Sequence, residues 1–308
     1  MAIVQDLYPS RQQDKPEIIE RKDPVINTRP EDADGSGLTA EQLRQYERDG
    51  FIALPQFFTP EEVAVFRKEL TRMTNDPETI RRQEAVKEPN SDIVRSIFCV
   101  HKLSSLFDRL SRHPRLLAIA GQILGGGVYI HQSRVNMKPG FKGQGFYWHS
   151  DFETWHVEDG LPRMRTVSCS ITLTENNEFN GPLMLIPGSQ NHYIACVGET
   201  PEDNYKSSLR AQKVGTPDDE SLTQLAESGG IKAPKGPAGT VLLFDCNTMH
   251  GSNSNISPFP RSNVFFVYNS IENAPVEPWS GQKPRPPFIA EREDISPLEP
   301  TQNPDFVS

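Results

Sequence analysis

The sequence predicts an α+β protein with a double-stranded β-helix core, the cupin-like jelly roll, supported by N-terminal helices. Two observations lead to this fold class. Helical patterns are concentrated before residue 125, whereas from Val128 onward apolar residues recur with a period of two. At least six short alternating runs, separated by turn residues, follow that change, as expected of facing antiparallel sheets.

The segment 1–37 is rich in Pro, Asp, Arg and Gln and shows little periodicity. We expect it to be a loosely ordered N-terminal arm that lies across the body of the protein. Residues 38–308 are expected to form a single domain, because length alone is a soft guide and β-barrel enzymes of this size are common. No chemistry is assigned to the arm.

Helix signals follow the arm. Thr39 with Gln42, and Thr59 with Glu62, have the spacing of capping boxes, and the second is followed by Pro at the first helical position. A further helical stretch is predicted over 103–124, interrupted by a proline and ended by a run of glycines. These helices are expected to pack on a sheet.

The predicted strands lie beyond Val128. In chain order they are VYIHQSRVNM (128–137), FYWHSDF (146–152), RTVSCSITLT (165–174), PLMLIP (182–187), GTVLLFD (239–245) and SNVFFVYNSI (262–271). The polar stretch 197–235 is too long for an ordinary connection, so it is predicted to be a lid or a helical insertion.

Composition excludes several classes of function. With 32 Lys and Arg against 41 Asp and Glu, the net charge of −9 argues against a nucleic-acid partner. No apolar run approaches the length of a membrane span, and the first residues lack a secretory pattern, so we predict a cytoplasmic protein without a membrane partner. The four cysteines lack C-x-x-C spacing and are expected to be reduced.

Two histidines and one carboxylate form a candidate metal site. His149 and Asp151 lie in the predicted strand 146–152, where a period of two puts them on the same face. His250 follows the predicted strand 239–245 after a short turn. Two imidazoles and one carboxylate are the facial triad that holds Fe(II) and leaves positions open for O₂. We therefore predict an iron site at His149, Asp151 and His250.

Arg261 strengthens this prediction. It opens the last predicted strand, eleven residues after His250, where its guanidinium could grip a carboxylate with two prongs. An isolated H-x-D pattern is weak evidence, and a loop histidine or a solvated strand-edge arginine would each be unremarkable. All of these features together favour the iron site.

Other polar residues nearby were weighed as ligands. His156 and Glu153 are close enough in sequence to compete, and we interpret both as groups around the site rather than as ligands. The remaining histidines considered have no acidic partner at ligand spacing, so a surface or hydrogen-bonded core position is expected for each. They are His101, His113, His131 and His192.

The run FYWHSDFETWHVEDG (146–160) resembles the signature of the ectoine hydroxylases, which belong to the phytanoyl-CoA dioxygenase-like oxygenases. The similarity extends from the leader YERDGFIALPQFFTPEEV (46–63) through the C-terminal strands. The resemblance implies iron at the triad, 2-oxoglutarate as cosubstrate, O₂ as oxidant and a homodimer. The implied reaction converts ectoine to 5-hydroxyectoine with release of succinate and CO₂, as part of compatible-solute synthesis in osmotic stress.

The resemblance also assigns binding residues. Lys138 and Arg261 match the contacts to 2-oxoglutarate, with lesser contacts implied at Asn136, Ser252 and Asn263. For ectoine it implies an amide hydrogen bond from Gln132 and aromatic walls from Trp155, Phe244 and Phe265. Ectoine is a cyclic amidinium carboxylate, and a delocalised cation is stabilised against aromatic faces. Ordinary barrel core is an equally good interpretation of the two phenylalanines.

Three alternatives stay open at this stage. The first is a related oxygenase that acts on another small molecule. The second is a non-catalytic, cupin-like metal-binding module, and the third is zinc hydrolase chemistry on the same ligands. Neither of the last two needs the cosubstrate grip at Lys138 and Arg261.

Overall fold

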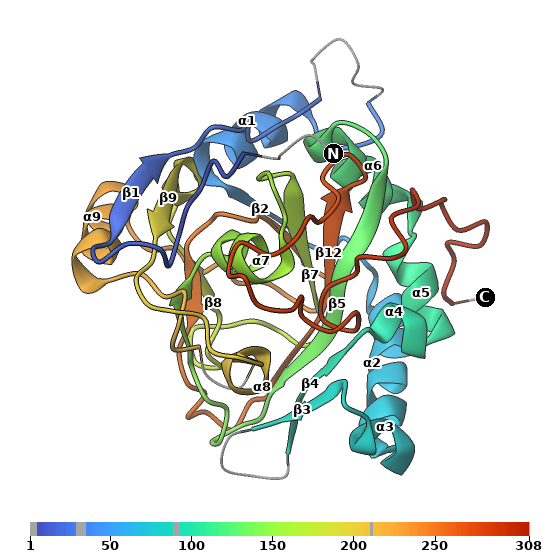
Figure 1. Cartoon of the computed structure of the whole chain (residues 1–308). Helices are drawn as coiled ribbons and strands as arrows, with labels where there is room; N and C mark the ends of the chain where they lie inside the picture. Colours follow the sequence, from blue (N-terminus) through green and yellow to red (C-terminus); the bar gives the residue numbers. More distant parts are fainter. Residues whose placement is uncertain (1–4, 29–34, 89–92, 210–211, 308) are drawn as a thin grey trace.

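The computed structural model describes residues 5–28, 35–88, 93–209 and 212–307. Within these residues the larger of two main antiparallel sheets has seven strands in the order β2–β10–β7–β12–β5–β4–β3 (Figure 1). Its strands are β2 (Phe51–Leu54), β3 (Ala85–Lys87), β4 (Val94–Phe98), β5 (Val128–Lys138), β7 (Thr166–Thr172), β10 (Val241–Asp245) and β12 (Arg261–Ser270). Strands far apart in the sequence are neighbours, as a jelly roll requires.

The smaller main sheet carries both histidines of the predicted metal site. Its order is β6–β11–β8, and its strands are β6 (Phe146–His149), β8 (Leu183–Leu185) and β11 (His250–Ser252). In the β6–β11 register, His149 and His250 are direct partners. Strand pairing therefore joins two residues that are distant in the sequence.

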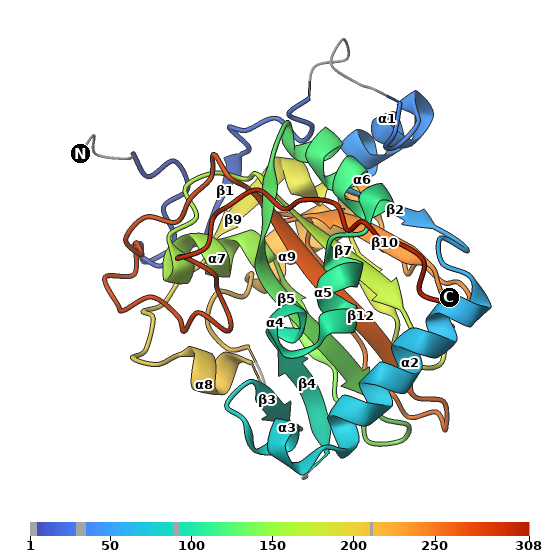
Figure 2. The ribbon, with the colours of Figure 1, turned by 90° about the vertical axis from the view of Figure 1, so that its right-hand side faces the viewer.

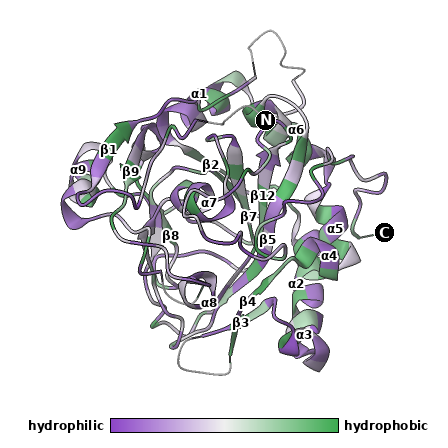
Figure 3. Ribbon diagram, viewed as in Figure 1, coloured by the Kyte–Doolittle hydropathy of each residue, from purple (hydrophilic) through white to green (hydrophobic). Residues whose placement is uncertain are grey.

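Helices cover the outer face of the larger sheet (Figure 2). They are α1 (Ala40–Asp49), α2 (Pro60–Asn75), α3 (Pro77–Arg81), α4 (Val100–Leu103), α5 (Ser105–Ser111) and α6 (Pro114–Leu124). Hydrophilic and hydrophobic segments alternate along several of them in Figure 3. Their apolar side chains, such as Phe66, Leu110 and Ile123, form the main core with Val264 and Phe266 of β12. The inner face of the sheet is left for the site.

The predicted helix signals are confirmed. The side chains of Thr39 and Thr59 each accept a hydrogen bond from the backbone N–H three residues on. In return, the backbone N–H of each threonine donates to the side chain of that residue, Gln42 or Glu62. The stretch predicted over 103–124 begins earlier and is divided into α4, α5 and α6, with Pro114 at the start of α6. Gly125 ends it with φ +73°, a left-handed conformation that favours glycine.

One predicted strand is too long. The run 146–152 was expected to be extended, but β6 ends at His149 and helix α7 (Asp151–Asp159) begins two residues later. The prediction that His149 and Asp151 lie on one strand is therefore wrong. Helix α7 has almost every residue buried, so its sequence lacks the apolar stripe that marks a surface helix.

The described part of the N-terminal segment packs on the body. Strand β1 (Glu17–Glu20) pairs with β9 (His192–Ala195), next to helix α9 (Asp219–Gly229) in Figure 1. Tyr8 and Arg11 are buried. Residues 1–4 and 29–34 of the predicted arm lie outside the described residues.

The polar stretch 197–235 contains α9 and the short helix α8 (Tyr205–Ser208). Residues 210–211 lie outside the part that the structure describes. Among the described helices, none combines the length and apolar character that crossing a membrane would need. All four cysteines are free and buried, as expected of reduced thiols.

Candidate functional site

His149, Asp151 and His250 converge from three elements. His149 ends β6, His250 begins β11 and Asp151 begins α7. The Nε2 atoms of His149 and His250 lie 3.7 and 3.8 Å from the two carboxylate oxygens of Asp151, and one ligand atom from each residue fits within 4.8 Å of the others. Among the described residues, this is the one cluster of His, Cys, Asp or Glu side chains with metal-site geometry.

Backbone carbonyls set the tautomer of both histidines. Nδ1 of His149 lies 2.8 Å from the carbonyl oxygen of Tyr147, and Nδ1 of His250 lies 2.9 Å from that of Thr248. A carbonyl can only accept, so each Nδ1 carries the proton and donates it. The Nε2 lone pairs are then left for a metal ion.

The charges at the cluster also favour a metal. Burial alone would raise the pKa of Asp151, but His250, His149 and Arg134 nearby lower it, so the group is a carboxylate. Burial, and then the neighbouring His149, lower the pKa of His250 to about 4, so its imidazole is neutral near pH 7. A buried carboxylate with two imidazoles is a donor set that fits Fe(II).

Asp151 takes its position from the turn that leads into β11. The N–H of Phe152 donates to the carbonyl oxygen of Cys246 over 2.8 Å, which ties the first turn of α7 to the end of β10. Gly160 ends the helix at φ +78°, where an added Cβ would lie 2.1 Å from the carbonyl oxygen of Val276. Close backbone approach at that end requires glycine.

One cavity joins the metal cluster to the inner face of the larger sheet. Because side chains alternate along a strand, polar residues at every second position of β5 and β12 point into it. Every residue predicted for metal, cosubstrate or substrate binding lines this cavity: Gln132, Asn136, Lys138, His149, Asp151, Trp155, Phe244, His250, Ser252, Arg261, Asn263 and Phe265.

One end of the cavity is cationic. Arg261 of β12 and Lys138 of β5 are partners in the strand register, so they lie opposite each other. Arg95 is near enough to lower the pKa of both. Burial, then Arg261 and Arg95, lower the pKa of Lys138 to about 6, and burial with Arg95 lowers that of Arg261 to about 10. The Nε of Arg261 is buried and has no hydrogen-bond partner among the described residues. This end suits a carboxylate ligand.

The predicted lesser contacts surround that cationic end. Lys138 Nζ donates to Ser252 Oγ over 2.9 Å and to the carbonyl oxygen of Asn253. Asn136, two residues before Lys138 on β5, accepts a hydrogen bond from its register partner Ser96 on β4 over 2.7 Å. Asn263 donates to the hydroxyl of a serine on β7. The structure thus groups all five cosubstrate residues at one end.

The other end of the cavity is largely aromatic. Phe244 lies 5.0 Å from the His250 ring, between ring centroids, and the Arg134 guanidinium lies 4.8 Å from the centroid of Phe265. Trp155 is 2% exposed over the whole residue but still reaches the cavity wall. The two phenylalanines therefore line the cavity while also belonging to an apolar cluster.

The amide of Gln132 is already partly bonded. Its Nε2 donates to the carbonyl oxygen of Ile289 over 2.9 Å, and its Oε1 accepts from Arg134. An amide NH₂ carries two protons, so among the described residues the second proton of Nε2 is available at the cavity wall. Gln132 thus combines a structural role with a free donor.

Three arginines that line the cavity were missed in the sequence: Arg95, Arg134 and Arg285. Arg134 lies on the same strand face as Gln132 and Lys138, so the period of two could have found it. Arg285 gave no signal because it lies in a segment without helix or strand. It reaches the wall through a two-pronged pair with Asp159, with Nε donating to Oδ1 over 2.7 Å.

The competing polar residues face elsewhere. Glu153 accepts from Ser10 and Arg11, and His156 contacts Asp6 and stacks on Trp279 with ring centroids 4.0 Å apart. Neither lines the cavity, so the interpretation of both as non-ligands is consistent with their positions. The other four histidines also lie outside the metal cluster.

Comparison with known proteins identifies the family. Residues 46–263 match the phytanoyl-CoA dioxygenase (PhyH) family. The chain belongs to the phytanoyl-CoA dioxygenase family. Within it, the ectoine dioxygenase of Bordetella parapertussis is 58% identical over 296 residues, which cover 96% of this chain and 96% of that protein. The ectoine dioxygenase of Stutzerimonas stutzeri is 54% identical over 294 residues, which cover 96% and 97%.

This phytanoyl-CoA dioxygenase family member is similar in structure to EctD from S. alaskensis. The crystal structure of that protein with 2-oxoglutarate and 5-hydroxyectoine has a TM-score of 0.88 at 47% identity, covering 96% of this chain and 98% of that one. The form with bound Fe has a TM-score of 0.86 at 46% identity. These likenesses confirm the predicted α+β jelly-roll fold.

Proposed function

We propose that this chain hydroxylates ectoine to 5-hydroxyectoine in a reaction that needs Fe(II), O₂ and 2-oxoglutarate and releases succinate and CO₂. One observation carries the proposal: a single cavity is lined by a metal-ligand triad, by the facing Lys138 and Arg261, and by aromatic side chains. Relatives more than half identical over nearly the full length are ectoine dioxygenases, which supports the choice of substrate.

We assign iron to His149, Asp151 and His250. Their buried donor set fits Fe(II), and the protonated Nδ1 atoms fix both rings with Nε2 toward the ion. Bound iron would supply O₂ activation coupled to oxidative decarboxylation of 2-oxoglutarate. The protein's own part is to hold the reactants close together and keep bulk water away.

Lys138 and Arg261 would hold the far carboxylate of 2-oxoglutarate. The Nε of Arg261, which has no partner among the described residues, and the facing amine of Lys138 supply directed donors at one place. A carboxylate there would satisfy the buried guanidinium and favour the charged form of Lys138. Ser252 would orient Lys138, and Asn136 and Asn263 would complete the polar wall.

The aromatic end would hold ectoine. Trp155, Phe244 and Phe265 offer faces for the amidinium, and Gln132 offers a free amide proton. Arg285 would meet the ectoine carboxylate, because Asp159 engages only two nitrogens of a guanidinium that carries five donors. In this arrangement the reacting carbon is turned toward the triad.

We propose that residues 38–308 form one domain. Within it, the segment 197–235 would act as a lid over the cavity. Several of its described residues line the cavity, namely Asn204, Ser208, Leu209, Gln212 and Val214. A polar segment over the mouth would exclude water during turnover. We further propose a cytoplasmic homodimer that serves compatible-solute synthesis in osmotic stress. The free, buried cysteines and the use of a central metabolite support the compartment.

The test is incubation of protein, loaded with Fe(II) without air, with 2-oxoglutarate, O₂ and ectoine, followed by mass spectrometry. We expect ectoine to gain the mass of one oxygen atom while an equal amount of succinate forms. Succinate without a modified ectoine would instead favour an oxygenase for another small molecule. No succinate at all, with metal bound, would favour a non-catalytic module and overturn the proposal.

A further inference from the structure

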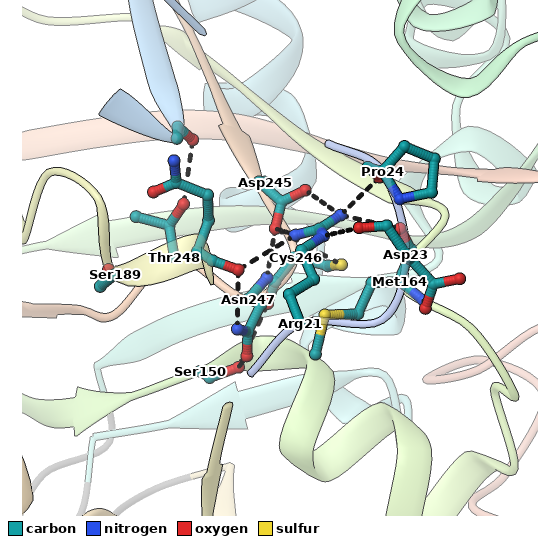
Figure 4. A network of polar contacts seen from close by, with 12 residues as sticks. Arg21, Asp23, Pro24, Ser150, Met164, Ser189, Asp245, Cys246, Asn247 and Thr248 are labelled. Carbon is teal, nitrogen blue, oxygen red and sulfur yellow. Dashed lines mark hydrogen bonds and ion pairs between the residues drawn. The ribbon is translucent and has the colours of Figure 1, made fainter. Parts of the chain in front are cut away.

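A buried arginine of the N-terminal segment reaches the turn between β10 and β11. Arg21 follows β1 directly, and its side chain is 4% exposed. Its NH1 and NH2 donate to the two carboxylate oxygens of Asp245 over 2.8 and 3.0 Å (Figure 4). Asp245 is itself 2% exposed over the side chain and ends β10. The pair is a two-pronged ion pair shielded from water.

The remaining donors of Arg21 fix its orientation. They bond backbone carbonyl oxygens of four residues: Asp23, Pro24, Met164 and Gln190. Figure 4 shows the guanidinium among Asp245, Asp23, Pro24 and Met164. A lysine has three donors on one nitrogen and cannot reproduce this planar pattern. The geometry at Asp245 is therefore specific for arginine.

Hydrogen bonds connect Asp245 to the segment that carries His149 and Asp151. Its Oδ1 also accepts from the N–H of Asn247 over 2.8 Å, and Asn247 Oδ1 accepts from Ser150 Oγ over 2.9 Å. Ser150 lies between His149 and Asp151. Figure 4 shows this route from Arg21 to Ser150. The side chain between two ligands is thus held by the turn that Arg21 anchors.

Backbone carbonyls of the same turn also accept hydrogen bonds from the start of α7 and from His250. Cys246 accepts from the N–H of Phe152, next to Asp151, and Thr248 accepts from Nδ1 of His250 over 2.9 Å. Thr248 Oγ1 is fixed in turn on the carbonyl oxygen of Gly50. Backbone bonds of 245–248 thus reach Asp151 through its neighbour Phe152 and His250 directly, while the side chain of Asn247 in the same turn bonds Ser150, which follows His149.

We propose that Arg21 is a positioning residue for the metal centre, acting through Asp245 and the turn 245–248. This inference rests on the proposed iron site and extends it to a segment with no ligand of its own. Loss of the guanidinium would leave a buried carboxylate unpaired at the start of the turn. The turn would then shift, and the Nε2 atom of His250 would no longer face the oxygens of Asp151.

The test uses Co(II) as a probe of the triad. In the full-length protein, Arg21→Met should weaken Co(II) binding by about 10- to 100-fold, as for other partners behind metal ligands, and should alter the Co(II) absorption bands. The Michaelis constant for 2-oxoglutarate, at saturating iron, should change far less, because Lys138 and Arg261 lie at the other end of the cavity.

Arg163→Met is the matched control. Arg163 Nε bonds Asp23 Oδ1 over 2.6 Å in the same N-terminal segment, but its side chain is 44% exposed and bonds no residue of the turn. We expect this variant to keep wild-type Co(II) affinity. The double variant Arg21→Met with Asp245→Asn should recover part of the affinity, because it removes the unpaired charge.

Two results would overturn the inference: an Arg21→Met protein with unchanged Co(II) affinity and spectrum, or an Arg163→Met protein that is equally impaired. If Arg21→Met fails to fold, Arg21→Lys and Asp245→Asn provide the same comparison, and unchanged Co(II) binding in both would reject it. Failure of the proposed function is distinguishable, because it would appear as missing succinate or missing hydroxylated ectoine in the wild-type protein, whereas this test compares Co(II) binding between the wild type and its variants.

Discussion

Arg261 and Lys138 face each other directly across strands β12 and β5, at the buried end of the cavity. Like charges opposite each other on neighbouring strands are destabilising. Here the pair is also shielded from water, and the Nε of Arg261 lacks a partner among the described residues. A bound carboxylate would satisfy this guanidinium and favour the charged form of Lys138, which is the physical basis for assigning the cosubstrate here.

Replacing Arg261 with alanine should raise the Michaelis constant for 2-oxoglutarate. Loss of charge-assisted hydrogen bonds costs about 2–3 kcal/mol, which corresponds to about 30- to 150-fold. The Michaelis constant of Arg261→Lys should lie between those of the wild type and Arg261→Ala, because lysine keeps the charge but lacks the planar, two-pronged donors of arginine. Steady-state kinetics with varied 2-oxoglutarate measures this, with exposed Arg67→Ala as control. An unchanged constant would move the grip to another residue.

Binding of 2-oxoglutarate should take up a proton. Burial, Arg261 and Arg95 lower the pKa of Lys138 to about 6, so the amine is mostly neutral near pH 7. A bound carboxylate favours the charged form and raises that pKa, so affinity should fall as pH rises above about 6. Anaerobic calorimetry in buffers of different ionisation enthalpy measures the uptake. Lys138→Met should abolish it, and zero uptake by the wild type would contradict the assignment.

Removing a ligand should abolish metal binding and turnover together. Asp151→Ala and His250→Ala each leave two donors, which is too few to hold Fe(II) in a facial site. Metal analysis after anaerobic loading measures occupancy. His192→Ala is the matched control, because that ring lies outside the cluster, near Glu20. A fully loaded, active Asp151→Ala protein would rule out this triad.

Arg285 should act on the organic substrate alone. Arg285→Lys keeps a cation beside Asp159 but loses the fork, so the Michaelis constant for ectoine should rise about tenfold while that for 2-oxoglutarate stays. Arg285→Leu should in addition lower the free energy of unfolding by about 3 kcal/mol, because it leaves Asp159 buried with less compensation. Equal effects on both constants in the lysine variant would argue against a substrate contact.

Sequence patterns predicted the parts of the fold that have a period. The alternating runs became β5, β7, β8, β10 and β12, and capping boxes marked the first two helices. The run after His149 misled, because α7 is buried on all sides and shows no helical stripe. A short buried run cannot be assigned to strand or helix by period alone.

Site residues, too, could be predicted only where the sequence carries a local signal. Residues with a local signal, such as the H-x-D pair and Arg261, could be predicted. Arg285 could not, because its position depends on a pair with Asp159 across 126 residues of sequence. Arg21 is similar: its bond to Asp245 spans 224 residues. Contacts of this kind are visible only after the chain has folded.

The most direct test of the central claim is turnover of ectoine under ¹⁸O₂ in ordinary water. The proposed reaction divides the O₂ molecule, so we expect one ¹⁸O atom in succinate and the other in the hydroxyl group of 5-hydroxyectoine. Mass spectrometry of both products measures this directly. Hydroxylated product and succinate that both lack the label would contradict the account.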